Sequence, residues 1–407
     1  MLTRQENHVD HLLRNLAEEL DIPLSKYDQA VNRYQSVGSH IERVYYPSAS
    51  GESLCYCQGS FRLGTVVRPI KEGKESDYDI DLVAQLPIAK NKTSPGEVKH
   101  LVGNRLKVDA RYNRMLKEEG KRCWTIEYAE EDGIGFHLDV LPAISEVIDI
   151  QRHLRSLPIP ADAEKYAIAI THKDESMYDW RSSNPAGYAE WFEAINRKIL
   201  PQIDYNERSI LVEKHPEIYA RVEDVPPMMV KTPLQRAIQI FKRHRDIRFA
   251  NSKWEKDKPI SMIITTITTR SFSGKPASTV LETIRDLITD LRQSSYGGLI
   301  TKNGGGWYIP NPVNPEENFA DKWHEDGDKK ARAFFMWLDW LEQDIEQLLH
   351  VHDLGKARVL VPALFGDRVA SGALNKLESR FGGSVFKQIA HQRVQINHKP
   401  ESPWQRG

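Results

Sequence analysis

The stretch Tyr78-Asp79-Ile80-Asp81-Leu82-Val83 alternates polar and apolar side chains, which predicts a β-strand with one buried face. On such a strand Asp79 and Asp81 lie on one face, and Ile80 and Leu82 lie on the other. Two neighbouring carboxylates repel each other, so burying them together without a cation is costly. Proteins usually hold Mg²⁺ with one or two carboxylates and the phosphates of a substrate. The stretch therefore predicts a metal site that handles phosphates.

A turn with the sequence Gln58-Gly59-Ser60-Phe61 comes shortly before this strand, at the end of a short strand-like run at 53–58. Glycine lets the backbone approach a phosphate closely, and serine adds a hydroxyl donor. Successive backbone N–H groups in such a turn can also bind phosphate. We therefore predict that Gln58, Gly59 and Ser60 bind a nucleotide.

A third strand-borne carboxylate follows in a predicted hairpin of 123–129 and 135–143, whose turn is Glu130-Glu131-Asp132-Gly133. Its second run alternates again and carries Asp139. Two metal ions about 3.5–4 Å apart can stabilise the attacking and leaving oxygens of a phosphoryl displacement, and three carboxylates suit that pair. We predict that Asp79, Asp81 and Asp139 are catalytic and hold two Mg²⁺ or Mn²⁺ ions, with Asp139 helping to take the proton from the attacking hydroxyl.

Each of these signals also has a structural interpretation. An Asp-x-Asp pair is common on solvated strand edges, and Asp139 alone could protect an edge from pairing. Asp77 precedes the alternating core and is interpreted as a loop residue. The order of the elements favours nucleotidyl transfer: a strand, a Gly-Ser turn, a strand with Asp-x-Asp, and a hairpin strand with Asp.

The composition is that of a globular protein with two domains or one large bilobed domain, since the chain has 407 residues. Its 56 Lys+Arg and 57 Asp+Glu nearly cancel, so no global field attracts nucleic acid. A run of about 18 apolar residues and a signal-peptide core are both missing, so we expect a cytoplasmic protein with no membrane partner. The three cysteines are interpreted as small buried hydrophobic residues.

Periodicity predicts helices at 9–20, at 23–40 and from Pro95 to Leu116, and a strand at 78–86. Gly38 and Ser39 weaken the second helix near its end. Beyond about residue 190 apolar stripes at helical spacing dominate, and 304–315 is predicted to be a loop rich in Gly, Pro and Asn. The outline is a mixed α/β front half and a helical back half, with the site between them.

Several longer segments resemble the bacterial CD-NTases, which are relatives of cyclic GMP–AMP synthase within the polymerase-β-like nucleotidyltransferase superfamily. The resemblance runs from about Ser36 to Phe365. The front segments that carry it are 58–69 (QGSFRLGTVVRP), 78–83 (YDIDLV) and 137–142 (HLDVLP). The back segments are 183–188 (SNPAGY), 232–239 (TPLQRAIQ), 241–246 (FKRHRD), 311–315 (NPVNP) and 317–321 (ENFAD).

The resemblance implies an α+β fold, with a polymerase-β-like nucleotidyltransferase core of mixed β-sheet and flanking helices and a helical C-terminal lobe. We place N-terminal helices and core at 1–190, the helical lobe at 191–385 and a flexible tail at 386–407. The implied activity is synthesis of a cyclic di- or trinucleotide from nucleoside triphosphates, with ATP and GTP expected. In this family such products signal phage infection to an effector protein (CBASS). No zinc-ribbon insertion is present, so a duplex DNA activator is not implied.

The same resemblance implies that Lys242 and Ser261 hold the donor triphosphate from the helical lobe. An aromatic residue that stacks on a base in animal relatives would fall near Met262. Without the resemblance, 242–245 would be interpreted as a solvated basic face. Asn184 suits a ribose or base contact, and equally a turn that enters a helix.

A helix beginning at Ile260-Ser261 is predicted, with Asp257 as cap and Pro259 in its first turn. The β-branched run 263–267 favours a strand instead, and we follow the resemblance and expect the helix. His137 and His244 are interpreted as structural.

The C-terminal Gly407 stands where some relatives are joined to a target by ubiquitin-like machinery, although a frayed end is the simpler interpretation. The main alternative function is a non-cyclising nucleotidyltransferase that modifies RNA, a protein or a small molecule. A catalytically silent nucleotide-binding scaffold is disfavoured, because it would not need three aspartates. The bases, the linkages and the ring size remain open.

Overall fold

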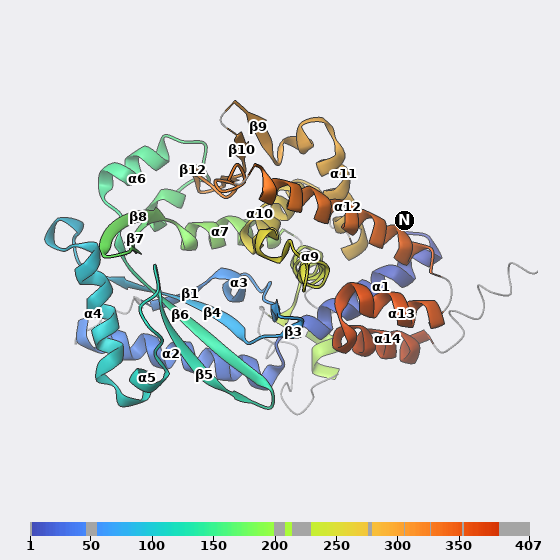
Figure 1. The fold of residues 1–407 in the computed structure, drawn as a ribbon, viewed down its shortest axis with the longest axis horizontal. Coiled ribbons are helices and arrows are strands. Elements are labelled where there is room, and N and C mark those ends of the chain that lie inside the picture. The colour runs from blue at the N-terminus through green and yellow to red at the C-terminus, as the bar shows by residue number, and fades with distance from the viewer. Residues whose placement is uncertain are drawn as a thin grey trace, which may run out of the picture.

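The computed structural model describes residues 2–45, 55–198, 208–213, 229–275, 279–304, 306–325, 327–351 and 354–381. Figure 1 shows a mixed β-sheet flanked by helices, beside a large helical lobe that also holds the first helix of the chain. The predicted tail at 386–407, with Gly407, lies outside the described residues. Among the helices in these ranges, none has the length and apolar character needed to cross a bilayer.

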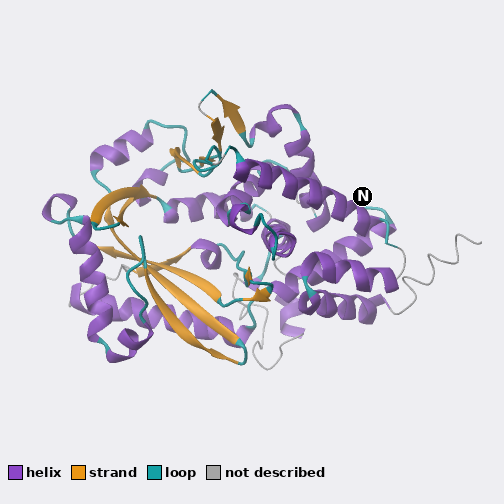
Figure 2. Ribbon diagram, in the orientation of Figure 1, coloured by secondary structure: helices purple, strands orange, loops and turns teal. Residues whose placement is uncertain are grey.

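The central sheet has the strand order β1-β4-β6-β7-β8, and β5 pairs with the first part of β6. Its strands are β1 Cys55–Gln58, β4 Tyr78–Leu86, β5 Trp124–Glu131, β6 Ile134–Ser145, β7 Ile168–Asp174 and β8 Met177–Ser183. The predicted strand at 78–86 and the predicted hairpin are confirmed. Strands β7 and β8 were not predicted, and they extend the sheet beyond the end of the hairpin (Figure 2).

Strand β4 pairs antiparallel with β1 and parallel with β6. The parallel step needs a crossover, and helices α4 Pro95–Val108 and α5 Ala110–Met115 lie along it, before β5. The apolar face of β4, with Ile80 and Leu82, packs on α4 and on α2 Leu24–Tyr45 in one buried cluster. The aspartate face of β4 is therefore turned away from these two helices.

Two of the predicted helix boundaries are wrong for identifiable reasons. The helix from Pro95 breaks at Asp109, whose carboxylate accepts the N–H groups of Arg111 and Tyr112 and so caps α5. Helix α2 continues to Tyr45, past the predicted end near residue 40. Gly38 lies inside the helix where β1 packs closely against it: a Cβ there would stand 3.0 Å from the Cβ of Cys55.

The largest core of the helical lobe is one in which α1 packs against α9, α11 and α14, and a smaller buried cluster joins α7 to α9. The predicted first domain, 1–190, therefore does not form one core by itself, because α1 belongs to the helical core and α2 to the core beside the sheet. The helices around this lobe are α1 Arg4–Leu20, α7 Pro185–Asn196, α9 Pro233–Phe249, α10 Ser261–Phe272, α11 Val280–Arg292, α12 Lys329–Leu349, α13 Leu354–Phe365 and α14 Asp367–Phe381.

The predicted loop at 304–315 instead lies within two small hairpins. Asn318 completes their hydrogen bonds, because its Oδ1 accepts from Ile309 N and its Nδ2 donates to Trp307 O. The strands are β9 Thr301–Asn303 with β10 Gly306–Tyr308, and β11 Pro310–Asn311 with β12 Asn314–Asn318. The remaining elements are α3 Gly59–Arg62, β2 Ile70–Lys71, β3 Lys74–Glu75, α6 Ile148–Arg155 and the 3₁₀ turns Lys90–Lys92, Ala163–Tyr166, Glu255–Asp257 and Ser294–Gly298.

Candidate active site

The three predicted aspartates lie on neighbouring strands and share one face of the sheet. The parallel register pairs Asp81 of β4 with Asp139 of β6, and Asp79 with His137. Residues directly opposite each other in a ladder point to the same face, and Asp79 stands two residues before Asp81 on its strand. The structure therefore brings together carboxylates that are separated by about 60 positions in the chain.

The Gly-Ser turn lies directly against Asp81. Strand β1 ends at Gln58, which is opposite Asp81 in the antiparallel register. Gly59 then adopts φ +63°, and a Cβ on it would stand 2.2 Å from Oδ2 of Asp81. Within the described part of the chain, neither the Ser60 hydroxyl nor the side-chain amide of Gln58 makes a hydrogen bond. The turn thus leaves polar groups available beside the carboxylates.

The electrostatics of the acidic face show uncompensated negative charge. Burial, with Asp139 and Asp79 nearby, raises the pKa of Asp81 to about 7. Burial also raises the pKa of Asp79. Asp139 Oδ1 accepts a hydrogen bond of 2.5 Å from Thr125 Oγ1, and His137 Nδ1 lies 3.3 Å from Asp79 Oδ1. The Asp81 carboxylate has no hydrogen bond or ion pair with any described residue, so a cation here would be favourable.

In the described ranges, no three His, Cys, Asp or Glu side chains are already arranged around one point as metal ligands. The side chains of Asp79 and Asp139 are turned to His137 and Thr125. The donor set still fits a hard cation, because it consists of oxygen ligands on one face, where burial and the neighbouring carboxylates together raise the pKa of Asp81. Asp79, Asp81 and Asp139 are the residues that would hold it.

From the helical lobe, Lys242 reaches the segment that follows the turn. Its Nζ donates to Thr65 O at 3.1 Å and to Thr65 Oγ1 at 3.2 Å. Burial, with Arg245 nearby, lowers the pKa of Lys242 to about 7. The alternative of a solvated basic face at 242–245 is wrong, since all four of these side chains are buried.

The helix predicted at Ser261 is confirmed as α10, and the β-branched run lies inside it. The predicted cap is wrong: Ile260 occupies the N-cap position, and Asp257 is buried at the end of a 3₁₀ turn. Asp257 instead forms ion pairs with Lys329 and Lys330, which hold it away from the helix end. Ser261 is exposed, and its hydroxyl accepts from Arg245 Nη1 at 3.1 Å.

Asn184 caps helix α7, as the helix-entry interpretation predicts. Its Oδ1 accepts from Gly187 N at 2.9 Å, and its Nδ2 donates to Ala163 O at 2.7 Å. The side chain is buried, so both ends of its amide serve the fold. A nucleotide contact by Asn184 stays a prediction.

Asp77 and His244 have structural environments, as predicted for both. Asp77 Oδ1 accepts from Gly135 N at 3.1 Å and so braces the start of β6. Buried His244 accepts from Trp337 Nε1 at its Nδ1 (3.1 Å), and its Nε2 lies 2.8 Å from Asp344 Oδ2. His137, which is also interpreted as structural, borders the acidic face and contacts Asp79.

All three cysteines are free. Cys55 is buried as expected, whereas Cys57 and Cys123 are only partly buried. Burial raises the pKa of Cys57 and Cys123 to about 12, so neither is a reactive thiolate.

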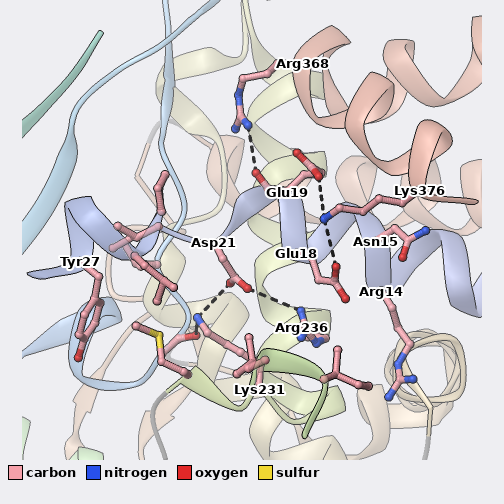
Figure 3. Close-up of a pocket in the computed structure, with 18 of the residues that line it drawn as sticks. Arg14, Asn15, Glu18, Glu19, Asp21, Tyr27, Lys231, Arg236, Arg368 and Lys376 are labelled. Atoms are coloured by element: carbon pink, nitrogen blue, oxygen red, sulfur yellow. Dashed lines mark hydrogen bonds and ion pairs between the residues drawn. The ribbon is translucent and has the colours of Figure 1, made fainter. Parts of the chain in front are cut away.

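A cavity of about 960 Å³ lies away from the acidic face, between α1, the start of α2, α14 and residues 229–236 (Figure 3). None of the three aspartates lines it. Its charged walls are largely paired with each other: Asp21 with Lys231 and Arg236, and Lys376 with Glu18 and Glu19.

Comparison with known proteins agrees with this geometry. Residues 55–142 match the family model for the nucleotidyltransferase domain of DncV-like cyclic GMP-AMP synthases. A c-di-GMP synthase from Roseivirga ehrenbergii is 26% identical over 365 residues, which are 89% of this chain and 85% of that protein. The cyclic dinucleotide synthase CdnG from Bradyrhizobium diazoefficiens is 25% identical over 397 residues, 93% of this chain and 85% of that protein.

The fold is also that of a solved structure. The CD-NTase CdnG of Bradyrhizobium diazoefficiens, solved in complex with GTP, superposes with a TM-score of 0.64 at 23% identity, covering 91% of this chain and 99% of that chain. The family model at 55–142 covers the strands that carry the acidic face, and the solved structure also matches the helical lobe. The chain is therefore a nucleotidyltransferase, with a DncV-like nucleotidyltransferase domain at 55–142 and similarity to cyclic dinucleotide synthases over most of its length.

Proposed function

We propose that this protein joins nucleoside triphosphates into a cyclic di- or trinucleotide and releases pyrophosphate. The observation that carries the proposal is the β4–β6 register, which sets Asp81 opposite Asp139, with Asp79 on the same face and the Gly59-Ser60 turn beside Asp81. The names of the two relatives, a c-di-GMP synthase and a cyclic dinucleotide synthase, support cyclisation. They also make GTP the first substrate to test, with ATP beside it.

In the proposed reaction, Asp79, Asp81 and Asp139 hold two divalent ions. When bound, these ions would neutralise the carboxylates and supply charge stabilisation to the attacking and leaving oxygens. The turn at Gly59 and Ser60 would bind the phosphates through backbone N–H groups and the free serine hydroxyl. Thr125 orients Asp139 by its hydrogen bond, so this carboxylate is poised to help take a proton from the attacking hydroxyl.

The helical lobe would complete the nucleotide site. Ser261 lies exposed at the first turn of α10, and Lys242 lies beside Thr65, close enough to Asp81 for their charges to interact. A triphosphate would add negative charge near Lys242 and favour its protonated form. We also propose that the product signals phage infection to an effector and that the protein acts in the cytoplasm. Ubiquitin-like machinery would act on Gly407.

The test incubates the purified protein with labelled GTP, ATP, CTP and UTP and with Mg²⁺ or Mn²⁺, followed by phosphatase. A phosphatase-resistant cyclic product is expected. Label transferred only to RNA, protein or a small alcohol would establish the non-cyclising alternative instead. No transfer with either metal, for a folded sample, would contradict the enzymatic proposal.

The test variant combines Asp79→Ala and Asp81→Ala, and the control variant is Asp179→Asn. Asp179 is an exposed aspartate on β8, an edge strand that β6 and β7 separate from β4. The double variant should abolish transfer while remaining folded, because it removes carboxylates that repel each other. Asp179→Asn should leave the rate unchanged. Activity retained in the double variant would refute the metal assignment.

A further inference from the structure

Four consecutive backbone carbonyls, just after the Gly-Ser turn, are each held by a long side chain from the helical lobe. The segment is Leu63–Val66, which has no regular secondary structure. The bonds are Gln235 Nε2 to Leu63 O (2.9 Å), Lys231 Nζ to Gly64 O (2.6 Å), Lys242 Nζ to Thr65 O (3.1 Å) and Gln239 Nε2 to Val66 O (3.1 Å). We call these four side chains the carbonyl clamp.

The N–H groups of the same segment hold the turn itself. Leu63 N donates to Gly59 O at 3.2 Å, and Thr65 N donates to Ser60 O at 2.9 Å. Each of these residues therefore bonds to the turn through its nitrogen and to the helical lobe through its oxygen. A displacement of α9 relative to this segment would pass to Gly59 and Ser60 through a single residue, Leu63 in one case and Thr65 in the other.

The clamp is buried, so its bonds are costly to break. The exposed fractions of Lys231, Gln235, Gln239 and Lys242 are 9%, 7%, 0% and 3%. A buried carbonyl that loses its donor keeps its desolvation penalty. Gly64 also fits only as glycine, since it has φ +66° and a Cβ there would stand 2.6 Å from Gln235 Nε2.

The side-chain amides of Gln235 and Gln239 are each oriented by a second hydrogen-bond partner. Gln235 Oε1 accepts from Thr232 N at 3.0 Å in the capping box of α9, which leaves its Nε2 for Leu63. Gln239 Nε2 also donates to Asp21 Oδ1 at 2.9 Å, and Asp21 can only accept when ionised. Asp21 lies 3.2 Å from Lys231 Nζ as well, so the end of α1 orients two members of the clamp.

We propose that the carbonyl clamp sets the position of the Gly59-Ser60 turn over Asp81, and that Lys231, Gln235 and Gln239 are positioning residues for nucleotidyl transfer. This inference rests on the proposed function of the site. The three side chains act through the turn and do not touch the aspartates. Misplacing a reacting group by about 1 Å can lower a rate by about 100-fold, so a loosened turn should reduce kcat more than it raises KM.

The sharpest variant is Gln235→Glu. Glutamate is a normal partner in a capping box, so the cap of α9 is kept while the donor to Leu63 O is lost. The matched control is Glu282→Gln, which makes the reverse change in the capping box of α11 at Thr279. Lys231→Met is the second variant, and it replaces Gln235→Glu in every comparison if that protein does not fold.

Two measurements are made on the full chain at a temperature where all variants are folded. The first is hydrogen–deuterium exchange of the peptide that spans residues 59–66, which should exchange at least about 10-fold faster in Gln235→Glu and unchanged in Glu282→Gln. The second is pyrophosphate release, where kcat should fall by about 10- to 100-fold in Gln235→Glu alone.

Unchanged exchange in Gln235→Glu would overturn the clamp. Faster exchange with an unchanged kcat would overturn the positioning role. The exchange result does not depend on the reaction, whereas absence of any cyclic product from the unsubstituted protein would count against the proposed function and not against the clamp.

Discussion

Gly59 lies so close to Asp81 that a Cβ on it would stand 2.2 Å from the carboxylate Oδ2. The turn and the acid come from different strands, β1 and β4, and meet because Gln58 pairs with Asp81. A glycine with φ +63° is therefore required here both by its backbone conformation and by the space that Asp81 occupies.

Gly59→Ala should abolish nucleotidyl transfer, with a loss of at least about 100-fold, because the methyl group displaces Asp81 or the turn. The control is Gly133→Ala, which has φ +71° but nothing within 4 Å of the added Cβ. Each variant should lose about 1–2 kcal/mol of unfolding free energy from its left-handed conformation. Pyrophosphate release and thermal unfolding distinguish the two; equal activity in both variants would contradict the close approach.

Asp81→Asn should stabilise the metal-free protein at pH 8 while abolishing activity. The folded pKa of Asp81 is raised to about 7, above an unfolded value of about 3.9. Between about pH 4 and pH 7 the carboxyl is ionised in the unfolded chain but still protonated in the folded one, so the wild type loses stability as the pH rises through this window, and the asparagine variant is spared that loss. Thermal unfolding at pH 4 and pH 8 in EDTA measures it. A variant less stable than wild type at pH 8 would contradict the raised pKa of Asp81.

With added Mg²⁺ or Mn²⁺, the wild type should become more stable than Asp81→Asn at pH 8. A cation that binds the folded wild type raises its melting temperature. Asp81→Asn should show a much smaller metal-dependent shift. An equal shift in both proteins would place the metal elsewhere.

Asn184→Ala should cost about 1–3 kcal/mol of unfolding free energy, because it removes the cap of α7 and leaves Ala163 O without its donor. Asn184→Asp keeps the cap acceptor and should cost less. Urea denaturation gives these values. The KM for each triphosphate should be unchanged in the folded variants if Asn184 serves only the fold, and a raised KM would establish the predicted nucleotide contact.

Asp344→Ala should destabilise the helical lobe by about 3–5 kcal/mol, since it leaves Arg248 and His244 without their buried carboxylate partner. The control on the same helix is Asp339→Ala, an exposed partner of Arg292 that should cost about 0–1 kcal/mol.

The contribution of Asp344 depends on pH. His244 and Arg248 hold the pKa of Asp344 below its usual range. Its stabilisation is therefore present above the unfolded pKa and is lost as the pH falls through the folded one. Urea denaturation at pH 7 and pH 3 should show the cost of Asp344→Ala shrinking at the lower pH; an equal cost at both would contradict the ion pair.

Local signals predicted much of the front half. Strand β4 was predicted with its observed bounds because its signals are local: the alternation lies within the strand, and turn residues stand directly next to it. The hairpin at 123–143 and the start of α4 at Pro95 were predicted for the same reason. The boundaries at Asp109 and near Gly38 were not, because the first depends on a side-chain cap and the second on a strand packed against the helix.

The sequence by itself determined which chemistry is available: three strand aspartates, a Gly-Ser turn and a helical back half, all readable from neighbours in the chain. Only the tertiary structure decided that Asp81 pairs with Asp139, that β7 and β8 complete the sheet, and that side chains from 231–242 hold the carbonyls of 63–66. The aspartate pairing and the carbonyl contacts join residues about 60 to 180 positions apart, and no local pattern encodes them. The carbonyl contacts form because the backbone carbonyls of 63–66 are buried between the sheet and the helical lobe. Buried carbonyls need hydrogen-bond donors, and here the donors are side chains of the helical lobe.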